Sequence, residues 1–213
     1  MLQAIELIFR SLRELDAEAT SFVQGFPTGL RWYHAHLYPN AKRDDSERDW
    51  TRELSSRLSA KELPTCPEYQ YPAYSETGRC DLRVQTLPGS YFWIEIKGAW
   101  KYLNDPAKRA VFRNSNYRKH LDNMAADVAR LNTLRTSDAS MIGLLLLGFY
   151  KKSDPMDEDI RGFVQKADIA NWPVESICWD DRNPDSVAHC WLWYRHLNLS
   201  LPKTPSAHFH HPI

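Results

Sequence analysis

Two acidic residues and a lysine near the middle of the chain have the types and the spacing for chemistry on a phosphodiester. Asp81 stands at the start of an alternating segment, and Glu95 and Lys97 flank a single residue at the end of the next one. Carboxylates supply the oxygen ligands that Mg²⁺ prefers, and an ammonium beside them can position a water molecule or neutralise charge that develops on a phosphate. The three residues therefore predict a site for Mg²⁺-assisted hydrolysis of a phosphodiester.

The segments that carry these residues have the period of a β-hairpin. Apolar and polar side chains alternate over residues 80–87 and again over 91–97, and a Pro-Gly pair lies between the two segments. In an antiparallel hairpin the start of one strand lies beside the end of the next, and residues two apart share a face. We therefore expect Asp81, Glu95 and Lys97 to converge.

Helices and a buried strand are predicted around this hairpin. Amphipathic spacing predicts the helices, and an apolar run of strand length is typical of a central strand that is buried on both faces. This order of elements predicts an α/β sandwich around a small mixed sheet. The expected helices cover residues 5–25, 47–60, 116–134 and 157–170, and the further strands cover residues 141–150 and 190–196. The chain is expected to consist of an N-terminal helix with its connector over residues 1–40, one domain over 41–200 and a tail over 201–213.

Asp81 and the triplet Glu95-Ile96-Lys97 on the following strand, preceded by a helix that carries Glu47 and followed by a long helix and a buried strand, resemble the PD-(D/E)XK nuclease superfamily, which has the restriction-endonuclease-like fold. The resemblance covers about half of the chain. It implies a metal-dependent nuclease in which Asp81, Glu95 and the intervening Ile96 belong to the shell of an Mg²⁺ or Mn²⁺ ion. It also implies that Lys97 positions or activates the water and that a glutamate of the preceding helix completes the shell.

Two glutamates of that helix compete for the last role. Glu47 stands three and seven residues before Trp50 and Leu54, at the edge of the core-facing stripe, as in the archaeal Holliday-junction resolvases that the helix resembles. Glu53 directly precedes Leu54 and points about 100° away from it. Glu47 is therefore the predicted ligand. Cys80 stands where the family name has proline, a position that varies within the superfamily.

Basic side chains gather directly after the triplet in a chain that is neutral overall. The 27 Lys and Arg residues balance 27 Asp and Glu residues, so no net charge points to a polyanionic partner. From Lys97 to Lys119, however, basic and aromatic residues interleave around a single acid, a composition suited to phosphate contact and base stacking. The alternative is a solvated loop whose charges point in several directions. The predicted nucleic-acid contacts are Lys101, Lys108, Arg109, Arg113, Arg118 and Lys119.

The predicted long helix adds one further candidate. His120 lies off the apolar stripe directly before Leu121, where related nucleases often carry a polar side chain that faces the active site, so the resemblance gives it a catalytic role. A second group of acids is explained instead as a solvated helix N-terminus, which favours negative charge through the helix dipole. These acids are Asp154, Asp157, Glu158 and Asp159.

Composition and segment character predict a cytoplasmic protein. The chain has 213 residues, of which 43% are hydrophobic and 25% charged, as is usual for a globular domain. The four cysteines are widely separated and form no zinc or thioredoxin motif. Charged residues interrupt the first apolar stretch, and the longest apolar run is too short for a membrane span. We expect the first helix to pack on the domain itself, on a second copy or on a partner protein.

The leading hypothesis is an Mg²⁺- or Mn²⁺-dependent endonuclease of bacterial defence or mobile-element biology, with DNA favoured over RNA as its nucleic-acid partner. Two alternatives stay open: a nuclease-like module without turnover that serves as a binding or scaffold subunit, and a toxin-type RNase on the same fold. The intact Asp81, Glu95 and Lys97 favour an enzyme over the scaffold. No feature of the sequence separates DNA from RNA.

Overall fold

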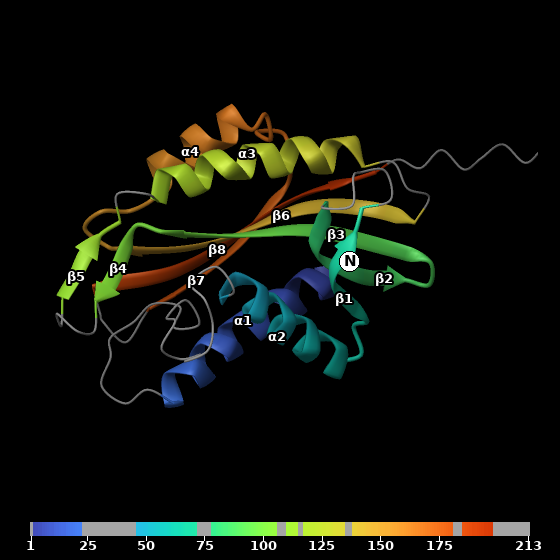
Figure 1. Cartoon of the computed structure of the whole chain (residues 1–213), viewed down its shortest axis with the longest axis horizontal. Coiled ribbons are helices and arrows are strands. Elements are labelled where there is room, and N and C mark those ends of the chain that lie inside the picture. The colour runs from blue at the N-terminus through green and yellow to red at the C-terminus, as the bar shows by residue number, and fades with distance from the viewer. Residues whose placement is uncertain are drawn as a thin grey trace, which may run out of the picture.

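The chain forms an α/β structure in which helices cover both faces of a mixed sheet, as the sequence predicts. Figure 1 shows α1 (Leu2–Phe22) and α2 (Ser46–Ala60) on one face of the sheet, and α3 (Tyr117–Thr133) and α4 (Asp157–Lys166) on the other. The computed structural model describes residues 2–22, 46–71, 78–105, 110–114, 117–134, 138–180 and 185–197. None of the helices described in these ranges is both long and apolar enough to cross a membrane.

Six of the described strands form the main sheet, in the order β1-β2-β3-β6-β8-β7. The first three form an antiparallel meander, β6 runs parallel to β3, and β8 runs antiparallel to both β6 and β7. Helix α3 therefore lies in the crossover that joins two parallel strands. The strands are β1 (Thr65–Gln70), β2 (Arg79–Leu87), β3 (Ser90–Trp100), β6 (Ala139–Lys151), β7 (Val174–Asp180) and β8 (Ser186–His196), and β4 (Tyr102–Asp105) pairs with β5 (Ala110–Arg113) in a separate hairpin.

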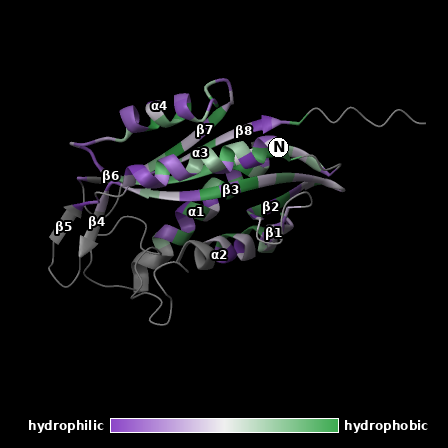
Figure 2. Cartoon of the chain, turned by 45° about the horizontal axis from the view of Figure 1, so that its top comes forward, coloured by the Kyte–Doolittle hydropathy of each residue, from purple (hydrophilic) through white to green (hydrophobic). Residues whose placement is uncertain are grey.

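Two hydrophobic layers hold the helices on the sheet. On one face, Ile8 of α1 and Leu54 of α2 pack with Ile94 of β3; on the other, Met124 of α3 packs with Trp93. In Figure 2 the hydrophobic colour is concentrated in the central strands, while hydrophilic stretches appear on the helices. The alternation predicted for residues 80–87 and 91–97 is therefore confirmed, and α1 belongs to the core of the sheet that carries the candidate site.

Candidate functional site

The sheet opens between β2 and β3 at the residues that the sequence predicts for the site. The register of the two strands ends at the pair Leu82–Ile94, although β3 continues along β6 on its other side. Two side chains of β2 replace main-chain pairing in this gap: the Cys80 thiol donates to the Ile94 carbonyl oxygen over 3.2 Å, and the N–H of Ile96 donates to Oδ2 of Asp81 over 2.7 Å. The Asp81 carboxylate is thereby held against β3.

The structure brings Asp81, Glu95 and Lys97 together, as predicted. Oδ2 of Asp81 lies 3.8 Å from Nζ of Lys97, and Glu95 is close enough to Asp81 to be affected by its charge and by a hydrogen bond. Glu95 and Lys97 follow Trp93 at steps of two on the face that α3 covers. The cluster therefore lies between the open part of the sheet and α3.

Glu95 is the most deeply buried acid of this cluster, with 1% of its surface exposed. Its Oε1 accepts a hydrogen bond of 2.6 Å from the Tyr71 hydroxyl and lies 3.6 Å from Nη1 of Arg130. Burial raises the pKa of Glu95 well above its usual value; the charge and hydrogen bond of Asp81 raise it further, and the Tyr71 hydrogen bond opposes the rise. Glu95 consequently keeps its proton at a pH where an ordinary glutamate has lost it.

Two residues of α3 that the sequence analysis did not identify complete the cluster. Asp127 is 5% exposed, its Oδ2 lies 3.7 Å from Nζ of Lys97, and its Oδ1 accepts a hydrogen bond of 2.6 Å from Nη2 of Arg130. Burial raises the pKa of Asp127, and the charges of Lys97 and Arg130 oppose this rise. One sequence signal was available: Asp127 follows His120 by seven residues, or about two helical turns, and so shares its face.

His120 lies on this side of α3 and is partly buried. Burial lowers its pKa, and the positive charges of Lys119 and Lys97 lower it further. The effect of Lys97 places the imidazole within electrostatic range of the cluster. His120 is therefore a neutral side chain near the candidate site at physiological pH, while its catalytic role remains a prediction.

The predicted contribution of Glu47 lies outside the described side chains. Glu47 belongs to the first turn of α2, a helix whose Leu54 and Leu58 pack on the face of the sheet opposite the cluster. Glu53 is exposed and lies 3.7 Å from Arg57 of the same helix, an ordinary surface pair. Of the two competing glutamates, Glu53 is therefore the one whose side chain is described, and it pairs with Arg57 on the surface of the helix.

Ile96 can contribute to the site only through its main chain. Its side chain is buried in the layer that α1 and α2 cover, away from the acids. Its N–H points to Asp81, and the N–H and C=O of one strand residue face the same neighbouring strand. The Ile96 carbonyl oxygen therefore faces the gap in which Asp81 and Glu95 lie.

The donor set suits a hard divalent cation that keeps part of its water shell. Within the described ranges no group of three or more His, Cys, Asp and Glu side chains could hold a metal ion. Mg²⁺, however, is commonly bound by one or two carboxylates with waters and substrate phosphates completing the shell. Asp81 and Glu95 provide such a pair, and the pKa of Glu95 is raised by burial and by the neighbouring Asp81, a cost that a divalent cation bound between them would reduce.

The basic segment after β3 is more strongly neutralised than its sequence suggests. Lys101 is 3% exposed, and its ammonium lies 2.5 Å from Asp154 and 3.2 Å from Asp159. It also donates to the Pro155 carbonyl oxygen, so the structure does not support Lys101 as a surface phosphate contact. Burial lowers the pKa of Lys101, but its hydrogen bonds with Asp154 and Asp159 more than offset this, and the pKa is raised overall.

The other predicted basic contacts are exposed or lie outside the described residues. Arg113 and Arg118 are largely exposed, but Arg113 lies 3.6 Å from Asp154 and Arg118 lies 3.2 Å from Asp159. Lys119 is also exposed. The two remaining candidates, Lys108 and Arg109, are not among the described residues. The helix N-terminus expected for the acids is confirmed, and Asp157 and Glu158 in the first turn of α4 are exposed, but Asp154 and Asp159 are not simply solvated, because they bind the basic segment.

Replacing Lys101 with alanine should destabilise the fold by about 2 kcal/mol, because it leaves the carboxylates of Asp154 and Asp159 without their buried cation. Breaking a fully buried pair costs about 3–5 kcal/mol, and the partial exposure of Asp154 reduces the effect. Urea unfolding measures the change. As a control, Lys166→Ala removes the exposed partner of Asp122 and should change stability by less than about 0.5 kcal/mol. Equal losses in the two variants would contradict the structural role of Lys101.

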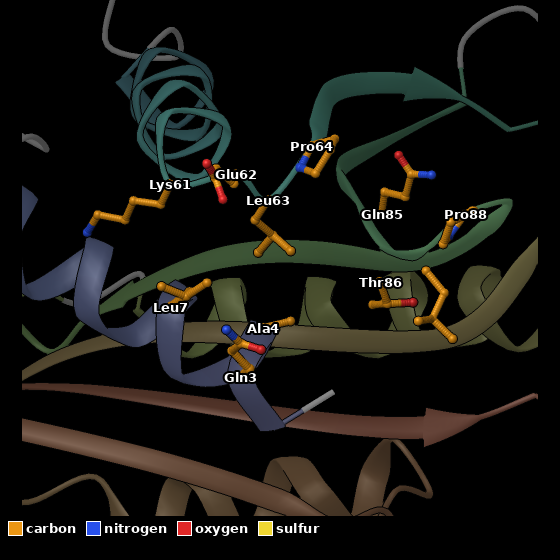
Figure 3. A pocket seen from close by; sticks show the side chains of 11 residues that line it. Gln3, Ala4, Leu7, Lys61, Glu62, Leu63, Pro64, Gln85, Thr86 and Pro88 are labelled. Carbon is orange, nitrogen blue, oxygen red and sulfur yellow. The ribbon is translucent and has the colours of Figure 1, made fainter.

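A separate pocket of about 440 Å³ lies at the other end of the β2–β3 hairpin. Figure 3 shows Leu7 of α1, Lys61 and Leu63 after α2, and Gln85 and Thr86 of β2 around it. Helices α1 and α2 lie on the face of the sheet opposite to α3, so this pocket does not contain the Asp81–Glu95 pair. The candidate site is consequently defined by its side-chain cluster.

Comparisons with known proteins leave the interpretation to this geometry. No family model matches the chain, and neither the search of curated proteins nor the search of solved structures finds a match.

Proposed function

We propose that this protein is a nuclease that uses Mg²⁺ or Mn²⁺ to hydrolyse phosphodiester bonds, with DNA as its substrate. The observation that carries the proposal is the acid pair formed by the buried Glu95 and the partly buried Asp81, which lies where β2 and β3 separate and has the Lys97 ammonium beside it. A buried carboxylate next to a second acid and a lysine is unfavourable for stability alone and is typical of active sites.

The order of the elements supports the PD-(D/E)XK superfamily as the source of this arrangement. Helix α2 precedes an antiparallel meander of β1, β2 and β3, and α3 then leads to β6, which is parallel to β3. This is the sequence of elements on which the resemblance rests. The site residues lie at the open part of that meander, on the two strands that the resemblance names.

Each group of the cluster has a chemical role in this proposal. Asp81 and Glu95 would hold the divalent ion, with the Ile96 carbonyl oxygen facing the same gap. When bound, such an ion lowers the pKa of a water molecule and stabilises negative charge on a phosphate. The Lys97 ammonium lies close enough to Asp81 to orient a water molecule or to neutralise a phosphate oxygen at the same place. Tyr71 fixes the orientation of the Glu95 carboxylate through its hydrogen bond.

The decisive experiment incubates the full chain with supercoiled plasmid, linear duplex, single-stranded DNA and RNA, each with Mg²⁺, Mn²⁺ or EDTA. We expect metal-dependent nicking or linearisation of the plasmid. Asp81→Asn should reduce cleavage by at least about a hundredfold, because it removes a charge while its amide oxygen can still accept the Ile96 N–H.

Asp122→Asn is the matched control, because this exposed acid of α3 pairs with Lys166 outside the cluster. It should cleave like the wild type. Cleavage of RNA alone would reassign the substrate, and tight binding without cleavage of any substrate would identify a binding module. Equal activity in Asp81→Asn and wild type would contradict the assigned site.

A further inference from the structure

The α3 residues of the cluster connect Lys97 with Glu95. Asp127 lies 3.7 Å from the Lys97 ammonium through Oδ2 and accepts the Arg130 guanidinium through Oδ1. The same guanidinium extends its other terminal nitrogen to within 3.6 Å of Glu95. Asp127 and Arg130, which we call the α3 bracket, therefore contact both residues of the Glu-x-Lys motif from the opposite side of the site.

The burial of Asp127 is difficult to explain by stability alone. The residue is 5% exposed on a helix whose other buried contacts with the sheet are mainly apolar, and its Oδ2 has no hydrogen-bond partner among the described residues. A buried carboxylate oxygen without a hydrogen bond is unfavourable. This oxygen lies at ion-pair distance from the Lys97 ammonium, and that ion pair offsets part of the cost of its burial.

Lys97 has carboxylates on two sides. Asp81 of β2 lies 3.8 Å from its Nζ, and Asp127 of α3 lies at nearly the same distance. An ammonium between two anions is held between them, whereas loss of one anion lets it move toward the other. The flexible lysine side chain thus depends on α3 for its position over the acid pair.

We infer that Asp127 is a positioning residue of the proposed nuclease, which holds the Lys97 ammonium in place and is itself fixed by Arg130. This inference rests on the proposed function. It implies that the reaction needs α3 as well as the hairpin, and that Asp127 acts through Lys97 rather than by touching the substrate.

The test measures steady-state cleavage by Asp127→Asn, which keeps the shape of the side chain and an oxygen that can accept from Arg130. We expect kcat to fall by about 10- to 100-fold, the range found when supporting residues of metal sites are replaced, while KM changes by less than about twofold. The control is Asp122→Asn, the same substitution on the exposed part of the same helix, which should leave kcat within about twofold. An unchanged kcat in Asp127→Asn would overturn the inference.

A double-mutant cycle separates positioning from a general structural effect. In a Lys97→Met background, Asp127→Asn should reduce the remaining rate by less than about twofold, because the residue through which it acts is gone. An equal fold-loss in both backgrounds would overturn the inference.

The contact can also be tested without turnover. In metal-free protein, the ¹H–¹³C NMR signal of the Lys97 Cε methylene, identified by its absence in Lys97→Met, should move in Asp127→Asn and stay in place in Asp122→Asn. If the Lys97 signal did not move in Asp127→Asn, the contact between Asp127 and Lys97 would be disproved. If the wild type cleaves no substrate, the proposed function fails, and this NMR comparison alone decides whether the bracket exists.

Discussion

Replacing Glu95 with glutamine should abolish cleavage and at the same time stabilise the fold. Glutamine keeps the shape of the side chain, can accept the Tyr71 hydrogen bond and can donate to Asp81, but it removes the negative charge. Loss of a proposed metal-binding carboxylate should reduce the rate at least about a thousandfold, since a bound ion would contribute several kcal/mol to stabilising the transition state. At neutral pH the folded wild type must either bury the Glu95 charge beside another acid or hold a proton that the unfolded chain releases, so its replacement by a neutral side chain should raise the free energy of unfolding by about 1 kcal/mol.

The stabilisation should depend on pH in a defined direction. The pKa of Glu95 is higher in the folded chain than its ordinary value of 4.5, so the folded state retains a proton that the unfolded state has released. The contribution of Glu95 to the free energy of unfolding of the wild type is therefore greatest below pH 4.5, and it declines as the pH rises toward the pKa of Glu95 in the folded chain. The advantage of Glu95→Gln should be small at pH 4 and should increase above about pH 5, as measured by thermal unfolding in EDTA.

Asp16→Asn provides a matched control. Asp16 of α1 is a buried carboxylate that accepts a hydrogen bond of 2.7 Å from the Trp179 side chain, and α1 covers the face of the sheet opposite the cluster. Its cleavage rate should match the wild type. If Glu95→Gln cleaved normally, or lost stability increasingly as the pH rose, Glu95 would not have the role assigned to it.

Lys97→Ala should reduce the cleavage rate by roughly two to three orders of magnitude at saturating substrate with Mn²⁺, the effect expected for loss of one preorganised charge. The reason is the position of its ammonium, which lies 3.8 Å from the predicted metal ligand Asp81. Lys97→Arg keeps the charge but changes its geometry, so its rate should fall between those of the wild type and the alanine variant.

The control for Lys97→Ala is Lys166→Ala, which removes an exposed lysine that lies 2.5 Å from a carboxylate of α3. Circular dichroism should show that both variants are folded. Equal cleavage by Lys97→Ala and wild type would point to a contaminating nuclease or to a different active site, and the mechanism would have to be abandoned.

The hairpin could be predicted from the sequence because its information is local. A period of two over residues 80–87 and 91–97, with a turn between them, determines which side chains share a face and which strand ends meet. The convergence of Asp81, Glu95 and Lys97 follows from that pattern alone. The long helix and the buried strand were also predictable, because their apolar spacing is regular and their length is sufficient.

The surroundings of the hairpin could not be predicted in the same way, since they depend on contacts between distant segments. From the sequence, Asp127 is expected to be an ordinary polar residue beside the apolar stripe, and only the packing of α3 on β3 shows that it is buried. From the sequence, Lys101 is expected to be a solvated cation, and only the fold brings Asp154 before α4 and Asp159 of α4 to it. In both cases the partner lies far away along the chain, and periodicity contains no information about it.

The two edge strands were missed for a different reason. β1 contains Pro67, which normally argues against a strand but is tolerated at a sheet edge, where one side of the strand needs no partner. β7 lies at the other edge, and its Val174 is largely exposed. Edge strands bury little apolar surface, so their sequences carry a weak alternating signal.

The place of β6 in the sheet has a consequence for synthesis of the chain. β6 is almost entirely apolar and pairs with β3 on one side and with β8 on the other. As the chain is made from its N-terminus, β3 is available before β6, but the second edge of β6 stays open until residues 186–196 have left the ribosome. An apolar strand with an open edge is a template for aggregation. Shortened chains that end before β8 would keep this edge uncovered permanently, so we expect β8 to protect the nascent protein although none of its described side chains belongs to the acid cluster.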